Sequence, residues 1–290
     1  MQIRPYKQVD VFTSIPYLGN PLAVVLNGAD LNDTQMQSFA RWTHLSETTF
    51  VLPPSDPKAD YHLRIFTPGG ELPFAGHPTL GSCHAWLEAG GKPKTEGLVV
   101  QQCGVGLVTI RREESRLAFS APPMRRSAPG ATLLARIAKA LGLKAEQIVA
   151  AQLLDNGTAW LGLLLDNTNT VLQLTPSFPD LKNLGHKVGV VALRSARAQG
   201  AAVDVPGVEV RAFAPHMGID EDPVTGSLNA SLAQWLMADG FMPAHYTAAQ
   251  GVCMGRAGQI DLQRDKHGDE EGQVWVGGQS VTCIDGVVRL

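Results

Sequence analysis

Short runs of β-branched and aliphatic residues recur along the chain between turn residues, a pattern that predicts strands. The predicted strands cover residues 9–14, 22–26, 48–52, 61–66 and 107–111 in the first half, and 152–154, 159–165, 188–193, 208–213, 258–262, 274–277 and 281–284 in the second. Helical periodicity follows Asn32 and precedes Gly142, which fits a helix end. Because strands outnumber helices and do not alternate regularly with them, the sequence predicts an α+β fold and not a doubly wound parallel sheet.

Two segments in opposite halves of the chain resemble each other. GHPTLGS at 76–82 and EDPVTGS at 221–227 share Pro, Gly and Ser at matching places, and each leads into a largely apolar run that closes on Gly. His77 aligns with Asp222, an offset of 145 residues (from 77 to 222) in a chain of 290. We interpret this repetition as a duplicated lobe.

The middle of the chain contains the best linker candidate, because residues 120–130 combine three prolines with small and charged residues. The length of 290 residues is about twice the ~100–150 of a typical domain. We therefore expect an N-terminal lobe at residues 1–120, completed by a strand at about 280–290, and a C-terminal lobe at 121–279.

Charge and composition exclude several classes of protein. The 24 Lys and Arg against 27 Asp and Glu leave a net charge of −3 and no basic stripe, so nucleic acid is not an expected partner. No run approaches the ~18–20 apolar residues of a membrane span, and the first residues lack the apolar core of a signal peptide, so we expect a cytoplasmic protein that does not bind membranes. The cysteines lack C-x-x-C spacing and the histidines form no metal-binding motif, which predicts buried free thiols, no disulfide and no metal site.

Each copy of the repeated segment predicts a helix start. Pro78 and Pro223 fit the first helical position, which leaves His77 and Asp222 at the N-cap. The unpaired N–H groups of a first helical turn, with roughly half a positive charge, favour an anion or a developing oxyanion. If a pseudo-two-fold axis relates the lobes, both helix starts would face one cleft suited to a small carboxylate or enolate. The alternative is structural, because Asp-Pro is common capping chemistry and a lone His is more often a cap or a core residue.

Glu47 is the third candidate. It directly precedes the strand predicted at 48–52 and stands near Leu45, Phe50 and Val51. Partial desolvation beside these apolar residues would raise its pKa and make it a competent general base. A surface carboxylate at a strand end, or a cap, explains Glu47 equally well, because sequence spacing does not place it in a cleft.

These segments together resemble the phenazine-biosynthesis PhzF-like family. The resemblance rests on LSETTF at 45–50, ELPFAGHPTLG at 71–81 and EDPVTGS at 221–227, with GNPLAV at 19–24 and the glycines around 251–255 in support. It implies a diaminopimelate-epimerase-like fold, in which two pseudo-symmetric lobes each form a β-barrel-like sheet around a central helix. It also implies an active site between the lobes, a small-molecule substrate, no cofactor and a homodimer.

Site residues are carried over from the resemblance by motif position. Glu47, His77 and Asp222 would be catalytic, with Glu47 as the acid/base that moves a proton between ring carbons in the phenazine isomerase. Gly76 and Ser227 would bind substrate. Asp222 would alternatively hold His77 or a substrate ammonium. Pro223-Val224 depart from the small residues of the phenazine enzymes, which leaves the substrate open.

The leading function is a cofactor-independent isomerase that moves a proton by general acid/base catalysis on a small cyclic or amino-acid-like carboxylate, resembling trans-2,3-dihydro-3-hydroxyanthranilate isomerase. One alternative is a racemase or epimerase of the same fold. Related racemases place a Cys at each helix start, whereas Cys83 lies six residues after His77 and its counterpart is Leu228, which contradicts a two-thiol mechanism. The other alternative is a non-catalytic metabolite-binding protein.

Overall fold

The chain folds into two compact units. The computed structural model describes residues 1–194, 207–265 and 272–290. Unit 1 comprises Met1–Ser120 and Gly277–Leu290, and unit 2 comprises Ala121–Val276. The chain returns to unit 1 within strand β17 (Val274–Gly278). Each unit is described below by itself.

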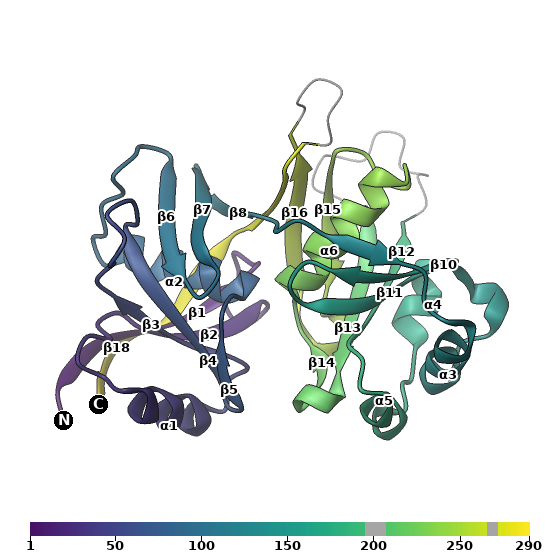
Figure 1. Cartoon of the computed structure of the whole chain (residues 1–290), viewed down its shortest axis with the longest axis horizontal. Coiled ribbons are helices and arrows are strands. Elements are labelled where there is room, and N and C mark those ends of the chain that lie inside the picture. The colour runs from purple at the N-terminus through teal and green to yellow at the C-terminus, as the bar shows by residue number, and fades with distance from the viewer. Residues whose placement is uncertain (195–206, 266–271) are drawn as a thin grey trace. The chain divides into compact units, whose positions relative to one another are not determined.

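Unit 1 is a mixed sheet wrapped around one helix (Figure 1). Antiparallel pairing joins β18 to β1 and β1 to β2, β2 and β3 are parallel, and β4 pairs antiparallel with β3 and β5 and parallel with β6. Strands β7 and β8 continue antiparallel from β6. The elements are β1 (Ile3–Val11), β2 (Asn20–Val25), α1 (Asp33–Thr43), β3 (Thr48–Leu52), β4 (Tyr61–Thr67), β5 (Gly70–Leu72), α2 (Gly76–Glu88), β6 (Leu98–Cys103), β7 (Gly106–Glu113), β8 (Arg116–Ser120) and β18 (Ser280–Arg289).

Unit 2 repeats this pairing order. Strand β9 pairs antiparallel with β10 and β10 with β11, β11 and β12 are parallel, β13 pairs antiparallel with β12 and β14 and parallel with β15, and β16 follows antiparallel. The elements are β9 (Arg125–Ser127), α3 (Ala131–Leu141), η1 (Ala145–Gln147), β10 (Ile148–Asp155), β11 (Ala159–Leu165), α4 (Thr168–Gln173), α5 (Phe178–Leu184), β12 (Val188–Leu193), β13 (Val208–Ala214), η2 (Pro215–Met217), β14 (Ile219–Asp222), α6 (Gly226–Ala238), β15 (His245–Gln250), η3 (Val252–Met254) and β16 (Gly258–Arg264). The duplicated lobe inferred from sequence is therefore present as a duplicated topology.

The central helices α2 and α6 are buried along most of their length. Helix α2 contacts β1, β2, β3, β4, β8 and β18, and α6 contacts β10, β11 and β16. Apolar and small residues surround both helices, which is the pattern of a helix enclosed by its own sheet. The predicted α+β fold with a sheet around a central helix in each lobe is confirmed.

The starts of these helices differ from the sequence prediction. Helix α2 begins at Gly76 after an N-cap Ala75, and α6 begins at Gly226 after an N-cap Thr225. The prediction that His77 and Asp222 are N-caps is wrong, because His77 is the second helical residue and Asp222 ends β14. Pro78 is the third residue of α2, whereas Pro223 lies three residues before α6. Proline needs no acceptor for an N–H group in either place, so it does not fix the first helical residue.

The structural alignment of the two helices consequently shifts. Gly76 corresponds to Gly226, an offset of 150 residues (from 76 to 226), and not of 145. His77 then corresponds to Ser227, and both are second in their helices. The first helical hydrogen bonds confirm this register, because the Thr79 N–H donates to the Ala75 carbonyl and the Asn229 N–H donates to the Thr225 carbonyl. With this offset Asp222 and His77 are not counterparts.

Several other predictions are resolved by the structure. Asn32 caps α1 through a capping box with Gln35, and Gly142 ends α3 with a φ of 72°. Strands β6, β8 and β15 were not predicted, since their apolar and polar residues alternate only weakly, and the linker candidate at 120–130 includes β9. All four cysteines are free, but Cys253 is exposed and Cys283 half-buried, so only the other two are buried thiols as expected.

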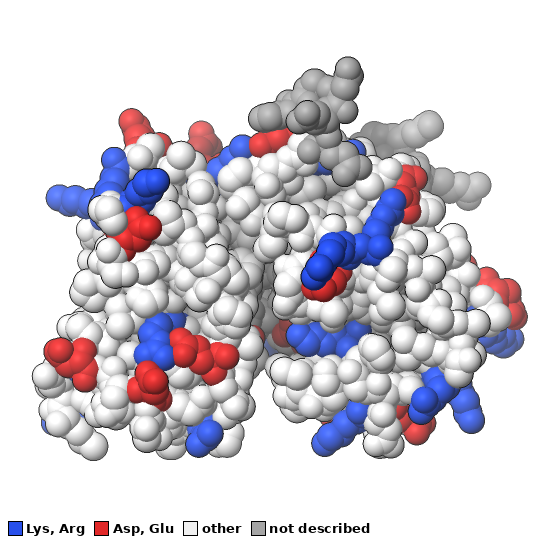
Figure 2. All heavy atoms as spheres, viewed as in Figure 1, with Lys and Arg blue, Asp and Glu red and all other residues white. Residues whose placement is uncertain are grey.

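Charges of both signs are interspersed on the face shown in Figure 2. Within the described residues no helix is long and apolar enough to span a membrane. Among the same residues no group of three or more His, Cys, Asp or Glu side chains is placed to hold a metal ion.

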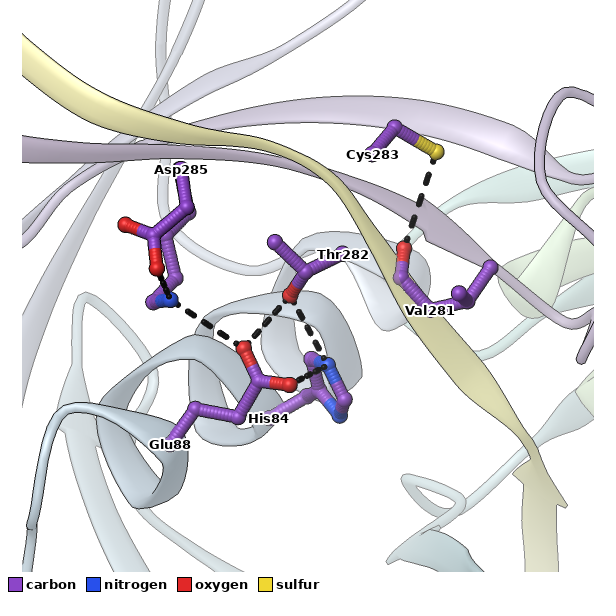
Figure 3. A network of polar contacts seen from close by, with 7 residues as sticks. His84, Glu88, Val281, Thr282, Cys283 and Asp285 are labelled. Atoms are coloured by element: carbon purple, nitrogen blue, oxygen red, sulfur yellow. Dashed lines mark hydrogen bonds and ion pairs between the residues drawn. The ribbon is translucent and has the colours of Figure 1, made fainter.

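A polar network joins β1, α2 and β18 in unit 1 (Figure 3). Lys7 Nζ lies 2.7 Å from Asp285 Oδ2 and 3.2 Å from Glu88 Oε2. The Thr282 hydroxyl donates to Glu88 Oε2 at 2.6 Å and lies 3.1 Å from His84 Nε2. Burial alone would raise the pKa of Glu88. The hydrogen bond from Thr282 and the charges of His84 and Lys7 outweigh burial, so the net shift of this pKa is downward. The network therefore fixes β18 to the central helix.

The network predicts a dependence of stability on pH. Burial lowers the pKa of His84, so below about pH 6.5 the unfolded chain binds a proton that the folded chain resists. The contribution of His84 to the free energy of unfolding is thus fully present above about pH 6.5 and is lost as the pH falls. We expect urea unfolding to show a smaller loss of stability between about pH 7.5 and about pH 5.5 for His84→Gln than for the wild type. A loss of the same size in both proteins would contradict the assignment.

Candidate active site

Glu47 is held at the start of β3 by the residues that follow it. Thr48 and Thr49 are fully buried, the Thr48 hydroxyl lies 2.9 Å from that of Thr43 at the end of α1, and the Thr49 hydroxyl lies 2.8 Å from that of Ser82 on α2. These bonds tie β3 to both helices of unit 1. The side chain of Glu47 is only 13% exposed, so of the alternatives that the sequence left open, a surface carboxylate is excluded.

His77 faces Glu47. Its Nε2 lies 3.4 Å from Glu47 Oε2, and its side chain is 6% exposed. On the other side of the ring, Nδ1 lies 3.4 Å from Nδ2 of Asn20, a buried residue at the start of β2. With the Asn20 amide donating, the neutral ring accepts at Nδ1 and carries its proton on Nε2, towards the carboxylate. The pair is therefore arranged to share or pass a proton.

The start of α2 adds donors beside this pair. Gly76 and His77 occupy the first two helical positions, where N–H groups have no intrahelical acceptor. The N-cap is Ala75, which has no side-chain oxygen to bond them. Gly76 is also buried. Such a helix start can bind a carboxylate or stabilise a developing oxyanion.

In unit 2, Asp222 and Ser227 flank the start of α6. Asp222 Oδ2 accepts a hydrogen bond of 2.5 Å from the Thr225 hydroxyl. The Ser227 hydroxyl oxygen accepts a hydrogen bond of 3.2 Å from the indole N–H of Trp160 on β11. The predicted residues therefore form two groups, Glu47, Gly76 and His77 in unit 1 and Asp222 with Ser227 in unit 2.

Sequence reasoning assigned no role to several residues that hold these groups. Asn20 and Gln250 lie in segments noted for their family resemblance, GNPLAV and QG, and that was the only signal for them. Trp160 is a buried residue of β11, and its indole N–H donates to the Ser227 hydroxyl. Thr225 lies inside the repeated segment, but its contact with Asp222 depends on a turn geometry that the spacing does not reveal.

Comparisons with known proteins show the family to which the chain belongs. The family model for phenazine biosynthesis-like protein matches residues 9–286. Antisense-enhancing sequence 1 of Schizosaccharomyces pombe is 34% identical over 97% of this chain and 97% of its own length. Trans-2,3-dihydro-3-hydroxyanthranilate isomerase of Pseudomonas chlororaphis is 31% identical over 98% of this chain and 99% of its own length. The solved structure of the Bacillus anthracis phenazine biosynthesis protein of the PhzF family has a TM-score of 0.85 at 21% identity, covering 100% of both chains.

A lobe built twice around a buried helix defines the α+β fold. The family match and the whole-length relatives named isomerases define the protein as an enzyme of the isomerase class. The chain belongs to the phenazine biosynthesis-like, or PhzF, family. The family resemblance, the fold class and the enzyme class expected from sequence are thereby confirmed. The roles of individual site residues and the substrate stay predictions.

Proposed function

We propose that the protein is a cofactor-independent isomerase that shifts a proton within a small cyclic or amino-acid-like carboxylate. The observation that carries the proposal is the approach of Glu47 Oε2 to His77 Nε2 at 3.4 Å, with both side chains largely shielded from water at the start of α2. A carboxylate in such surroundings is a suitable general base at neutral pH. The isomerase activity named for the Pseudomonas chlororaphis relative supports the same reaction class.

The proposed chemistry is a proton shift with no net change in atoms. Glu47 removes a proton from a carbon next to an electron-withdrawing group, and the electron pair moves into an enolate or extended π system. The proton then returns at a second carbon on the same face, which moves the double bond. Gly76 and the other N–H groups of the α2 start bind the substrate carboxylate or the developing oxyanion.

We further propose roles for two residues of unit 2. Asp222 manages a proton on an amine or hydroxyl group of the substrate, and Ser227 binds substrate through its hydroxyl. We further propose that the enzyme works in the cytoplasm as a homodimer, without a metal or other cofactor.

The racemase alternative finds less support. A racemase removes a proton on one face and returns one on the other, so it needs two groups that exchange protons. The second position of α6 holds Ser227, where α2 holds His77, and an alcohol is a poor acid or base near neutral pH. The position of α6 that corresponds to His77 therefore supplies no second acid or base, which favours the isomerase.

The test is to incubate the wild type with trans-2,3-dihydro-3-hydroxyanthranilate, and in parallel with proline and other small amino acids, in deuterated water. Proton NMR and chiral chromatography then follow double-bond position, deuterium uptake and configuration. We expect a moved double bond with deuterium at one of the exchanging carbons and no racemisation. Racemisation with deuterium at Cα would overturn the proposal in favour of an epimerase, and binding without any exchange would favour a metabolite-binding protein.

A further inference from the structure

We infer that Gln250 is a positioning residue for the reaction. By donating to the Thr225 hydroxyl oxygen, Gln250 directs the hydroxyl proton of Thr225 to Asp222, which is thereby held as a hydrogen-bond acceptor. The inference rests on the proposed function in giving Asp222 a role at the substrate. The contacts that support it all lie within unit 2 and join the end of β15 to the turn between β14 and α6.

Gln250 bonds the β14–α6 turn at several points. Its Nε2 lies 2.9 Å from the Asp222 carbonyl oxygen and 2.9 Å from Thr225 Oγ1. Its Oε1 accepts from the Thr225 N–H at 3.0 Å and from Asn229 Nδ2 at 2.9 Å. Gln250 is only 2% exposed, so each of these amide bonds replaces a bond to water. One side chain therefore holds both ends of the turn that carries Asp222.

The backbone fixes the orientation of the Gln250 amide. The Thr225 N–H can only donate, so the atom facing it must be the carbonyl oxygen, Oε1. The Asp222 carbonyl can only accept, so the atom facing it must be the amide nitrogen, Nε2. The two assignments agree with each other, and a flipped amide would break both bonds.

This orientation sets the direction of the next hydrogen bond. Since Gln250 Nε2 donates to Thr225 Oγ1, the single hydroxyl proton of Thr225 is free to point to Asp222 Oδ2, 2.5 Å away. That separation is typical of a hydroxyl donating to an ionised carboxylate. Asp222 Oδ2 is thus an acceptor in this arrangement.

Unit 1 contains a counterpart that lacks the carboxylate. Gln101, on β6, the strand that pairs parallel with β4 as β15 pairs with β13, is fully buried, donates to the Thr79 hydroxyl at 3.0 Å and accepts from the Tyr61 hydroxyl at 3.0 Å. Thr79 is the fourth residue of α2, as Asn229 is of α6. The two glutamines share the task of fixing the central helix to its sheet. Only Gln250 also reaches an N-cap hydroxyl, because Ala75 stands where α6 has Thr225.

The test combines a spectroscopic readout with kinetics. A buried Thr225 hydroxyl proton that is donated to Asp222 exchanges slowly with water. It can be observed by NMR through contacts to the labelled Thr225 methyl group. We expect this signal in the wild type and in Thr225→Ser, through the corresponding labelled Ser group. We expect its loss in Thr225→Val and Asp222→Asn, and its loss or broadening in Gln250→Met, which keeps the side-chain length but donates no hydrogen bond.

Gln101→Met is the matched control. It removes an equally buried glutamine that also contacts a central helix, so it costs stability without touching Asp222. The hydroxyl signal is expected to persist in Gln101→Met. If the signal persists unchanged in Gln250→Met, or disappears equally in Gln101→Met, Gln250 does not direct the hydroxyl and the inference is wrong. This readout needs no substrate, so it separates a failure of the inference from a failure of the proposed function.

Kinetics supply the second readout. If the wild type is active, we expect Thr225→Val and Gln250→Met each to lower kcat by about tenfold with little change in KM. The reason is that both variants disturb the Asp222 carboxylate and leave the binding of the substrate in its ground state unchanged. Thr225→Ser should recover most of kcat. The double variant should lose no more than either single one, because both act through one chain of bonds. Additive losses, or an increase confined to KM, would overturn a positioning role.

Discussion

Replacing Glu47 with Gln is expected to lower kcat by about 10²- to 10⁴-fold, the usual contribution of a general base. Glutamine keeps the size of the side chain and can still bond His77, but it accepts no proton. The fold should survive, because Thr48 and Thr49, and not the carboxylate, anchor the start of β3. Deuterium uptake into trans-2,3-dihydro-3-hydroxyanthranilate and product formation are the measurements, with urea unfolding to check the fold.

Two further variants define the Glu47 experiment. Glu96→Gln removes an exposed carboxylate of the same unit and should leave the rate unchanged. Glu47→Asp keeps the charge but withdraws it from His77 by one methylene, so it should retain part of the rate. Exchange that continues at the wild-type rate in Glu47→Gln would remove Glu47 as the base and leave His77 as the candidate.

Truncating Trp235 to Ala is expected to destabilise the protein by about 3–5 kcal/mol. Trp235 lies on α6, is 0% exposed, and donates from Nε1 to Asp239 Oδ2 at 2.8 Å. The change leaves a cavity under the sheet of unit 2 next to Gly162, whose missing Cβ makes room for the indole ring. Urea unfolding followed by circular dichroism measures the loss.

Trp42 is the control for this prediction. It is 74% exposed at the end of α1, where it stacks on Phe39 with ring centroids 6.1 Å apart. Trp42→Ala should therefore change stability by less than about 0.5 kcal/mol. Similar losses for both tryptophans would contradict the difference in burial on which the prediction rests.

The sequence predicted the parts of the fold that leave a strong periodic pattern. The face of α1 formed by Met36, Phe39 and Ala40 is buried as expected, and the repeated segments led to the duplicated topology. Strand β6 was missed, since its buried Gln101 interrupts the apolar pattern that marks a strand.

The candidate site was predictable by residue type but not by geometry. Glu47 and His77 were named from motifs, and the structure brings them to 3.4 Å because β3 and α2 are neighbours, which no local pattern encodes. The alignment of His77 with Asp222 was wrong, because the motifs align with an offset of 145 residues whereas the helix starts align with an offset of 150. Gln250 could not have been assigned, because its role depends on a strand end meeting a turn 25 residues earlier in the chain.

The contribution of β18 to unit 1 has a consequence for synthesis on the ribosome. Strand β1 pairs with β18 from Ile3 opposite Arg289 onwards, whereas every strand of unit 2 between β9 and β16 comes from one continuous stretch. At about 5–20 residues per second, β1 therefore waits roughly 15–60 s for its partner. Unit 2 can close during that interval, while β1 has an open edge on its β18 side. Nascent chains of this protein are thus most exposed to strand-edge aggregation through their first strand, until the final ten-residue strand is made.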